Sequence, residues 1–259
     1  MTLKERFDCM PRQIKRALVF LLIVINLIAC TPSKNKLPGG LILEEYELTQ
    51  SPTLEPVTFQ PIDDSQETIL AKHERQRKQV IPIPVHFVDG NPALKATWGG
   101  GELTALVFTD AENTPEQVVK VLSKDETLFT TSAGMPSPVM PLQGLWTYGR
   151  HWALEILYAD PETWAGRIFI DGILINEERG YNEAFGFQLL SGKPFYFYQR
   201  NGLIGIAYDG QEVNLDYTNI PHYLCCSESA LNPIPAEDMV AFFAQRDETW
   251  YYVELGNFK

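Results

Sequence analysis

The sequence predicts an all-β fold made of antiparallel hairpins, and three observations support that prediction. From residue 81 to residue 259, short apolar and aromatic runs alternate with Gly, Asn and Asp turns. Long segments with the 3.6-residue period of an amphipathic helix are missing from this region. Three hairpins recur along the chain at a spacing of about 44 residues, which indicates an internal repeat.

The first residues have the order of a bacterial signal peptide. Basic residues precede an apolar run over 17–28, about twelve residues long, which is shorter than the roughly 20 needed to span a bilayer. The run ends in Leu27-Ile28-Ala29-Cys30. This ending resembles the lipobox of bacterial lipoproteins.

The lipobox resemblance implies that residues 1–29 are removed. Cys30 then becomes the first residue, diacylated on its sulfur and acylated on its amine with fatty acids such as palmitate. It also implies anchoring in the cell membrane or envelope, facing outside the cytoplasm. A transmembrane anchor that keeps its cysteine and a secretory signal cut elsewhere are the alternatives.

The segment 30–64 is expected to be a flexible tether. It contains five prolines and Gly39-Gly40, and only the apolar residues 41–43 interrupt its polar character. About 34 residues of such chain would hold a folded body a few tens of ångströms from the bilayer. Residues 65–80 could form a short spacer helix, since Asp64 can cap it with Glu67 three residues later. The segment 81–259 is the predicted folded domain.

The charge of the chain excludes one class of function. Its formal net charge is −12, whereas a nucleic-acid-binding protein needs a basic surface. Without residues 1–29 there remain 16 basic and 31 acidic residues, a net charge of −15. Anionic headgroups repel such a body, so it is expected to stand off the membrane.

The repeated hairpins start at residues 152, 195 and 239, and a weaker copy begins near residue 103. Asp-Gly closes the outgoing strand of the first two hairpins, because Gly provides the positive φ of the turn. Gln-Arg ends the inner strand of the last two. An aliphatic strand follows each Asp-Gly, as in 173–175.

The segment that follows Thr114 matches a helix capping box, but its β-branched residues favour a strand over 118–121.

The period and the strand order are similar to WD40-like β-repeats and, more loosely, to bacterial WG-type repeats. This resemblance implies a propeller-like body of about four units. The Gly-His and Trp-Asp pairs of WD40 repeats are missing. An open β-repeat stack and a β-sandwich are therefore the alternatives.

The pair Cys225-Cys226 is the most unusual local feature. No other cysteine of the mature body is free to pair with these two, so a strained vicinal disulfide that stiffens a turn is expected. Two unpaired buried thiols, a redox or intermolecular disulfide function, and a metal site with His222 are the alternatives. The metal site is disfavoured because no fourth ligand has suitable spacing, so neither a metal nor a cofactor is predicted.

Other residues carry weaker signals for chemistry. His151 and Glu155 share a strand face, but no nucleophile accompanies them, so a packed or exposed histidine is expected. The aromatic runs 195–198 and 250–252 would suit a binding surface if one face were exposed, although a core role is favoured. Nucleophile-elbow, zinc-protease and phosphate-loop motifs are missing.

These observations together predict a membrane-anchored lipoprotein with a non-catalytic β-repeat domain. Its partner is expected to be a protein or a glycan at the cell envelope. An envelope hydrolase without a recognisable motif is the alternative.

Overall fold

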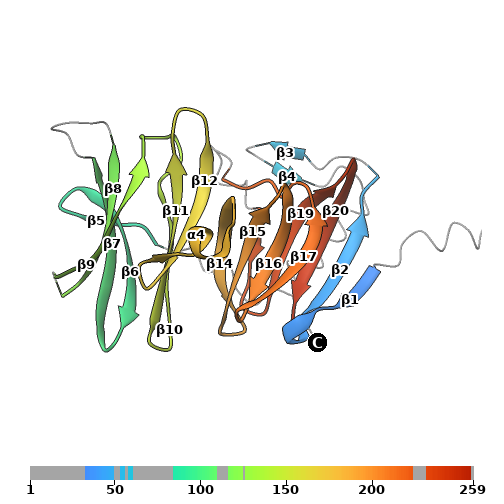
Figure 1. The fold of residues 1–259 in the computed structure, drawn as a ribbon, viewed down its shortest axis with the longest axis horizontal. Helices are drawn as coiled ribbons and strands as arrows, with labels where there is room; N and C mark the ends of the chain where they lie inside the picture. Colours follow the sequence, from blue (N-terminus) through green and yellow to red (C-terminus); the bar gives the residue numbers. More distant parts are fainter. Residues whose placement is uncertain are drawn as a thin grey trace, which may run out of the picture. The chain divides into compact units, whose positions relative to one another are not determined.

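The computed structural model describes residues 33–49, 53–55, 58–60, 84–109, 116–124, 126–223 and 232–257. These residues form antiparallel sheets and hairpins, with one α-helix of five residues and one 3-10 turn over Pro38–Gly40 (Figure 1). The predicted all-β class is confirmed. The described strands form no closed barrel or propeller.

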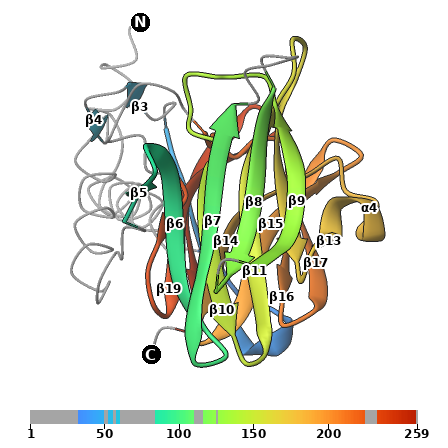
Figure 2. The ribbon, with the colours of Figure 1, turned by 90° about the vertical axis from the view of Figure 1, so that its left-hand side faces the viewer.

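The first sheet layer is a meander of five antiparallel strands, which Figure 2 shows face on. The strand predicted over 118–121 is confirmed as part of the fourth strand of this meander, Gln117–Ser123. Its strands are His86–Val88 (β5), Asn91–Trp98 (β6), Gly101–Thr109 (β7), Gln117–Ser123 (β8) and Glu126–Gly134 (β9).

The second layer continues the same sheet through one parallel bridge, from Gly134 to Ala159. Buried residues of both halves, such as Leu103 and Leu154, share one core, so the sheet folds over on itself. The strand predicted over 173–175 has only two residues and gives way to a helix that ends at Gly180 in the left-handed conformation. The elements are Leu142–Tyr148 (β10), His151–Ala159 (β11), Trp164–Ile170 (β12), Ile173–Leu174 (β13) and Ile175–Arg179 (α4).

The third and fourth layers are separate sheets. The third contains Glu183–Leu190 (β14), Lys193–Arg200 (β15), Leu203–Tyr208 (β16) and Gln211–Tyr217 (β17). The fourth contains Ile234–Pro235 (β18), Met239–Arg246 (β19), Thr249–Gly256 (β20), Ile42–Glu47 (β2) and, at its edge, Ser33–Lys36 (β1). Thr53–Glu55 (β3) and Thr58–Gln60 (β4) pair with each other.

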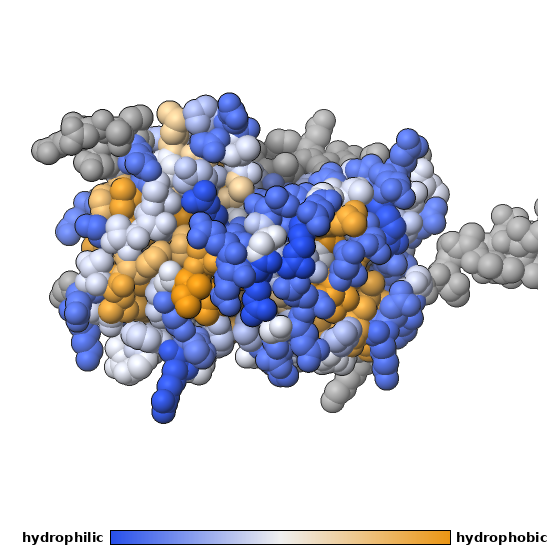
Figure 3. Space-filling model, in the orientation of Figure 1, coloured by the Kyte–Doolittle hydropathy of each residue, from blue (hydrophilic) through white to orange (hydrophobic). Residues whose placement is uncertain are grey.

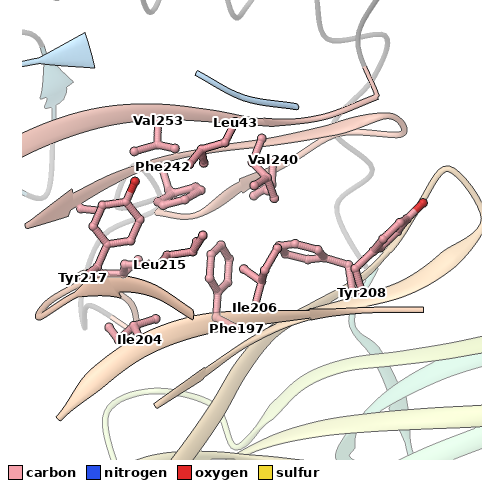
Figure 4. Packing of buried hydrophobic residues seen from close by; sticks show 14 of the residues in the cluster. Leu43, Phe197, Ile204, Ile206, Tyr208, Leu215, Tyr217, Val240, Phe242 and Val253 are labelled. Carbon is pink, nitrogen blue, oxygen red and sulfur yellow. The ribbon is translucent and has the colours of Figure 1, made fainter. Parts of the chain in front are cut away.

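Apolar side chains join these layers face to face. Figure 4 shows Leu43, Val240 and Phe242 of the fourth sheet packed toward the third. A second cluster, which includes Ala153 and Tyr196, joins the third sheet to the second layer. Both faces of the third sheet are thus buried, and its aromatic strand 195–198 belongs to the core, as favoured from the sequence.

The three predicted hairpins are confirmed as β11–β12, β15–β16 and β19–β20. Each hairpin ends in an equivalent backbone hydrogen bond that closes the pair of strands. The three bonds are Asp171 N to Trp152 O (3.1 Å), Asp209 N to Pro194 O (2.9 Å) and Asn257 N to Asp238 O (2.8 Å).

The recurring Gln-Arg pairs form equivalent contacts in the third and fourth sheets. Arg200 binds Glu212 at 2.9 Å and lies over the rings of Tyr181 and Tyr198. It also donates to the carbonyl of Arg179, two residues before Tyr181. We call this set an arginine clamp, because one guanidinium joins two strands and an aromatic pair.

Arg246 forms the second arginine clamp. It binds Glu45 at 2.7 Å, lies over Tyr217 and Tyr251, and donates to the carbonyl of Leu215, again two residues before the tyrosine. In the third sheet the glutamate comes from β17, the fourth strand. In the fourth sheet the glutamate comes from β2, which lies near the start of the sequence. β2 therefore occupies in the fourth sheet the position that β17 has in the third.

The flexible tether predicted over 30–64 is wrong for residues 33–49. β2 pairs antiparallel with β20 from Ile42 to Glu47, and Leu41 and Leu43 are buried in the core. The apolar run 41–43 contributes enough buried surface to order this segment despite the neighbouring prolines. The folded body therefore includes this strand as well as residues from the predicted domain 81–259. The possible helix over 65–80 lies outside the described residues.

Candidate functional site

An open groove of about 420 Å³ lies where the β11–β12 hairpin approaches α4 and the start of β14. Tyr158 and Arg167 come from neighbouring strands, and the Arg167 guanidinium lies 3.4 Å from the centre of the Tyr158 ring. Contact at this distance is a cation–π interaction, which fixes both side chains at the groove. Asp160, Thr163 and Glu177 also line it.

The rim of this groove is held by hydrogen bonds. The Asp160 carboxylate accepts from the amides of Glu162 and Thr163 and from the Thr163 hydroxyl, at 2.7 to 2.9 Å. These bonds, first that from the Glu162 amide, lower the pKa of Asp160. Buried Asn176 bonds the Ile168 amide and the Gly166 carbonyl, which ties α4 to β12. The groove is therefore preformed and carries charges of both signs.

A smaller hollow of about 220 Å³ lies on the outer face of the first meander. Half-buried Leu106 and Leu122 line it beside an ion pair in which Lys95 Nζ lies 2.7 Å from Glu102 Oε1. The hydrogen bond from Lys95 lowers the pKa of Glu102. The ion pair neutralises both charges, so this hollow offers less to a ligand than the Tyr158–Arg167 groove.

On the face drawn in Figure 3, hydrophobic residues lie in separate areas divided by hydrophilic residues. Seven large apolar side chains of the described residues are exposed, and they are scattered over several elements. They are Val85, Phe87, Leu128, Met135, Trp164, Ile173 and Leu203. Scattered apolar side chains are normal on a protein surface, so they mark no docking surface by themselves.

Glu155 is a buried carboxylate between the second layer and the third. It is 3% exposed and accepts hydrogen bonds from the amides of Gly186 (2.9 Å) and Phe187 (2.7 Å) and from the Tyr223 hydroxyl. Gly186 has a φ of 66° at an irregularity in β14, which turns both amides toward the carboxylate. Burial raises the pKa of Glu155. The geometry indicates a structural contact between layers.

His222 is held on both ring nitrogens. Nδ1 lies 2.6 Å from the Ile220 carbonyl and Nε2 lies 3.1 Å from Glu183, while the ring stacks on Phe185. Glu183 also accepts from the Gly166 amide. Both ring nitrogens therefore lie within hydrogen-bond distance of a protein oxygen. The disfavoured metal site at His222 gains no support from this arrangement.

His151 and Glu155, which share a predicted strand face, do not meet in a common site. His151 Nδ1 lies 2.5 Å from the Asp171 carboxylate at the surface, whereas Glu155 is buried. Asp171 also accepts from the Trp152 amide. In the next hairpin, Lys193 binds Asp209 at 2.5 Å in the same position. Of the two outcomes expected from the sequence, a packed or an exposed histidine, His151 is the exposed one, and it binds the aspartate of a turn.

Cys30, Cys225 and Cys226 lie outside the described residues, so lipidation and the vicinal disulfide stay predictions. Within the described ranges no group of three His, Cys, Asp or Glu side chains is arranged to hold a metal ion. The same residues include no helix that is long and apolar enough to cross a membrane.

Sequence reasoning did not identify the Tyr158–Arg167 groove. The signal was the hairpin itself: Tyr158 pairs with Ala165, two residues from Arg167, so both side chains point to the same face. Comparison with known proteins adds no guidance, because no protein family, no curated protein and no solved structure matches this chain.

Proposed function

We propose that the chain is a bacterial lipoprotein, anchored in the cell envelope through Cys30, whose β-sheet body binds a partner without catalysis. The lipobox Leu27-Ile28-Ala29-Cys30 supports the anchor. The Tyr158–Arg167 groove supports binding and is the observation on which this part of the proposal rests. Tyr and Arg are enriched among the residues that contribute most to binding, and a preformed groove loses little entropy when it is occupied.

A protein and a glycan are the two partner classes, and the groove favours a protein. Arg167 covers a face of the Tyr158 ring on which a sugar would stack. Asp160 and Glu177 next to Arg167 suit the mixed charges of a protein surface. The hydrolase alternative would need an acid and a base in one cleft, and in this groove the carboxylates of Asp160 and Glu177 would have to supply both. The hydrogen bonds that lower the pKa of Asp160 disfavour it as the acid.

The body itself is proposed to be an open stack of related β-units of about 44 residues rather than a closed propeller. The equivalent hairpin bonds and the two arginine clamps support this relation. In this arrangement β2 completes the last unit, because its Glu45 takes the part that Glu212 takes in the unit before.

The anchor is tested with Cys30→Ser. Because the thiol is the acylation site, the variant is expected to carry no acyl groups and to keep its leader uncut, so that no lipidated form of mature size appears in the detergent phase. Fractionation of cells with phase partition and intact mass checks both expectations. A Cys30→Ser protein that stays in the detergent phase at its mature size would contradict the lipoprotein assignment.

The groove is tested with a photo-crosslinking amino acid at Thr163, which is exposed on the rim. In living cells we expect a crosslink to one protein, and expect Tyr158→Ala or Arg167→Ala to reduce it at least tenfold, as for interface residues worth about 1.4 kcal/mol or more. Mass spectrometry distinguishes peptide from sugar adducts.

Two controls accompany this experiment. The same crosslinker at exposed Glu126 samples the first meander, at the end of β9 opposite to the bridge between Gly134 and Ala159. Lys120→Ala also removes a cation from an aromatic ring, since Lys120 Nζ lies 4.7 Å from the centre of the Phe108 ring, but this pair lies outside the groove. Equal crosslinking from both positions, or equal loss in Lys120→Ala, would rule out the groove as the binding site.

A further inference from the structure

We propose that residues 33–47 form a rigid mount that holds the folded body directly against the lipid headgroups, with edge strand β1 facing the bilayer. The inference rests on lipidation of Cys30 and replaces the expectation of a body that stands off on a long tether. It assigns a membrane-facing surface to this chain.

The distance along the chain limits how far the body can stand from its anchor. Only three peptide links separate Cys30 from Ser33, the first residue of β1. At no more than about 3.6 Å per residue, they span at most about 11 Å. A flexible tether of 34 residues would instead have an average end-to-end distance of about 30 Å. The ordered strands leave no such slack.

β2 is firmly attached to the core, so the mount transmits the position of the anchor to the body. It pairs with β20 over six successive residues. Leu41 is 0% and Leu43 is 4% exposed, and both lie in the cluster between the third and fourth sheets. Glu45 accepts from Tyr217 and Arg246 of two different sheets. Displacement of the strand would break all of these contacts together.

The charge of β1 fits a lipid surface. All four of its residues are exposed, and two of them are the cations Lys34 and Lys36. Lys34 binds Glu44 at 2.8 Å yet its side chain remains 60% exposed. The mature chain as a whole carries −15. Because Glu44 offsets the charge of Lys34, anionic headgroups would attract this edge only weakly, but they would repel the acidic remainder of the body, and this difference favours one orientation.

The test uses the full lipidated protein, purified from membranes and reconstituted in vesicles of phosphatidylethanolamine and phosphatidylglycerol. A fluorescent amino acid replaces either Lys36 on β1 or Thr130 on β9, both exposed. A fraction of the lipid carries a spin label on its headgroup. We expect at least threefold stronger quenching at position 36 than at position 130.

The matched control inserts twelve Gly and Ser residues between Cys30 and Thr31, which gives the anchor the slack that the structure lacks. This insertion is expected to reduce quenching at position 36 to the level at position 130, while lipidation and vesicle binding persist. Equal weak quenching at both positions in the unmodified protein would overturn the mount.

Failure of the anchor itself gives a different result. The protein would then remain in the supernatant, and intact mass would show no acyl groups on Cys30. That outcome would overturn the lipoprotein assignment and the mount with it. Vesicles of phosphatidylcholine alone separate the two contributions, because they keep the short link but remove the attraction between the lysines and anionic lipid.

Discussion

Removal of residues 33–49 is expected to unfold the fourth sheet, so that the domain predicted from the sequence, 81–259, does not fold alone. Leu41 and Leu43 lose their burial, worth about 2 kcal/mol each. β20 loses its partner over six residues and leaves an open edge next to buried Val253 and Leu255. Hydrogen exchange of the β20 amides and the melting temperature measure this loss. A chain starting at residue 81 with protected β20 amides would show that β2 is dispensable.

A pair of single substitutions separates the role of β2 from the general effect of a deletion. Glu45→Gln removes the charge from a carboxylate that is 9% exposed and binds Arg246 and Tyr217. Glu212→Gln makes the same change in the other arginine clamp, where the carboxylate is 27% exposed.

Glu45→Gln leaves the charge of Arg246 unbalanced in the more buried of the two sites. We therefore expect the free energy of unfolding of this variant to fall by about 3 kcal/mol. The second variant is expected to lose about 1 kcal/mol or less. Urea denaturation of both variants compares the two free energies directly. Equal losses would mean that the clamp formed with β2 contributes no more than the clamp within the third sheet.

The hairpins were predictable because their signals are local. Asp171-Gly172 and Asp209-Gly210 specify tight turns through residues that tolerate a positive φ, and both aspartates have a φ of 51°. Strand alternation on either side then sets the register. The short helix α4 was missed because Ile175 continues an aliphatic run that is typical of a strand. The signal for the helix was Gly180, because a glycine in the left-handed conformation commonly ends a helix.

The place of β2 was not predictable from local pattern. Prolines and glycines surround it, and its partner strand β20 lies about two hundred residues further along the chain. A longer-range signal does exist. Glu212 follows Arg200 by twelve residues, whereas the position twelve after Arg246 holds Phe258, which has no carboxylate, so the acidic partner of Arg246 has to come from another part of the chain.

The contact between the second and third layers was also hidden in the sequence. Glu155 stands in an apolar strand, where a carboxylate has no partner nearby in the chain. Its partners come from a strand irregularity at Gly186 and from Tyr223, 31 and 68 residues away. A charged residue in a strand buried on both sides was the only available signal that such a contact exists.

Glu155→Ala is expected to destabilise the fold by about 4 kcal/mol. It leaves three buried donors, from Gly186, Phe187 and Tyr223, without an acceptor, and each unsatisfied donor costs about 1 to 3 kcal/mol. Glu155→Gln keeps the volume and one acceptor oxygen, so its loss is expected to be smaller. Urea denaturation at neutral pH gives both values. A loss below about 1 kcal/mol in Glu155→Ala would contradict a structural role for this carboxylate.

The pH dependence of Glu155→Gln tests the burial of the charge itself. Burial raises the folded-state pKa of Glu155 above its ordinary value of 4.5, so the folded state binds more protons than the unfolded state above that value. Wild-type stability relative to Glu155→Gln should therefore fall as the pH rises from about 4.5 through the raised pKa. Asp160→Asn is the matched control, since Asp160 also accepts three hydrogen bonds but is only partly buried, and its pKa is lowered. For that variant the wild-type advantage should instead shrink as the pH falls through the lowered pKa. Denaturation curves between pH 3 and pH 8 with the same sign of slope for both variants would contradict this assignment of the two carboxylates.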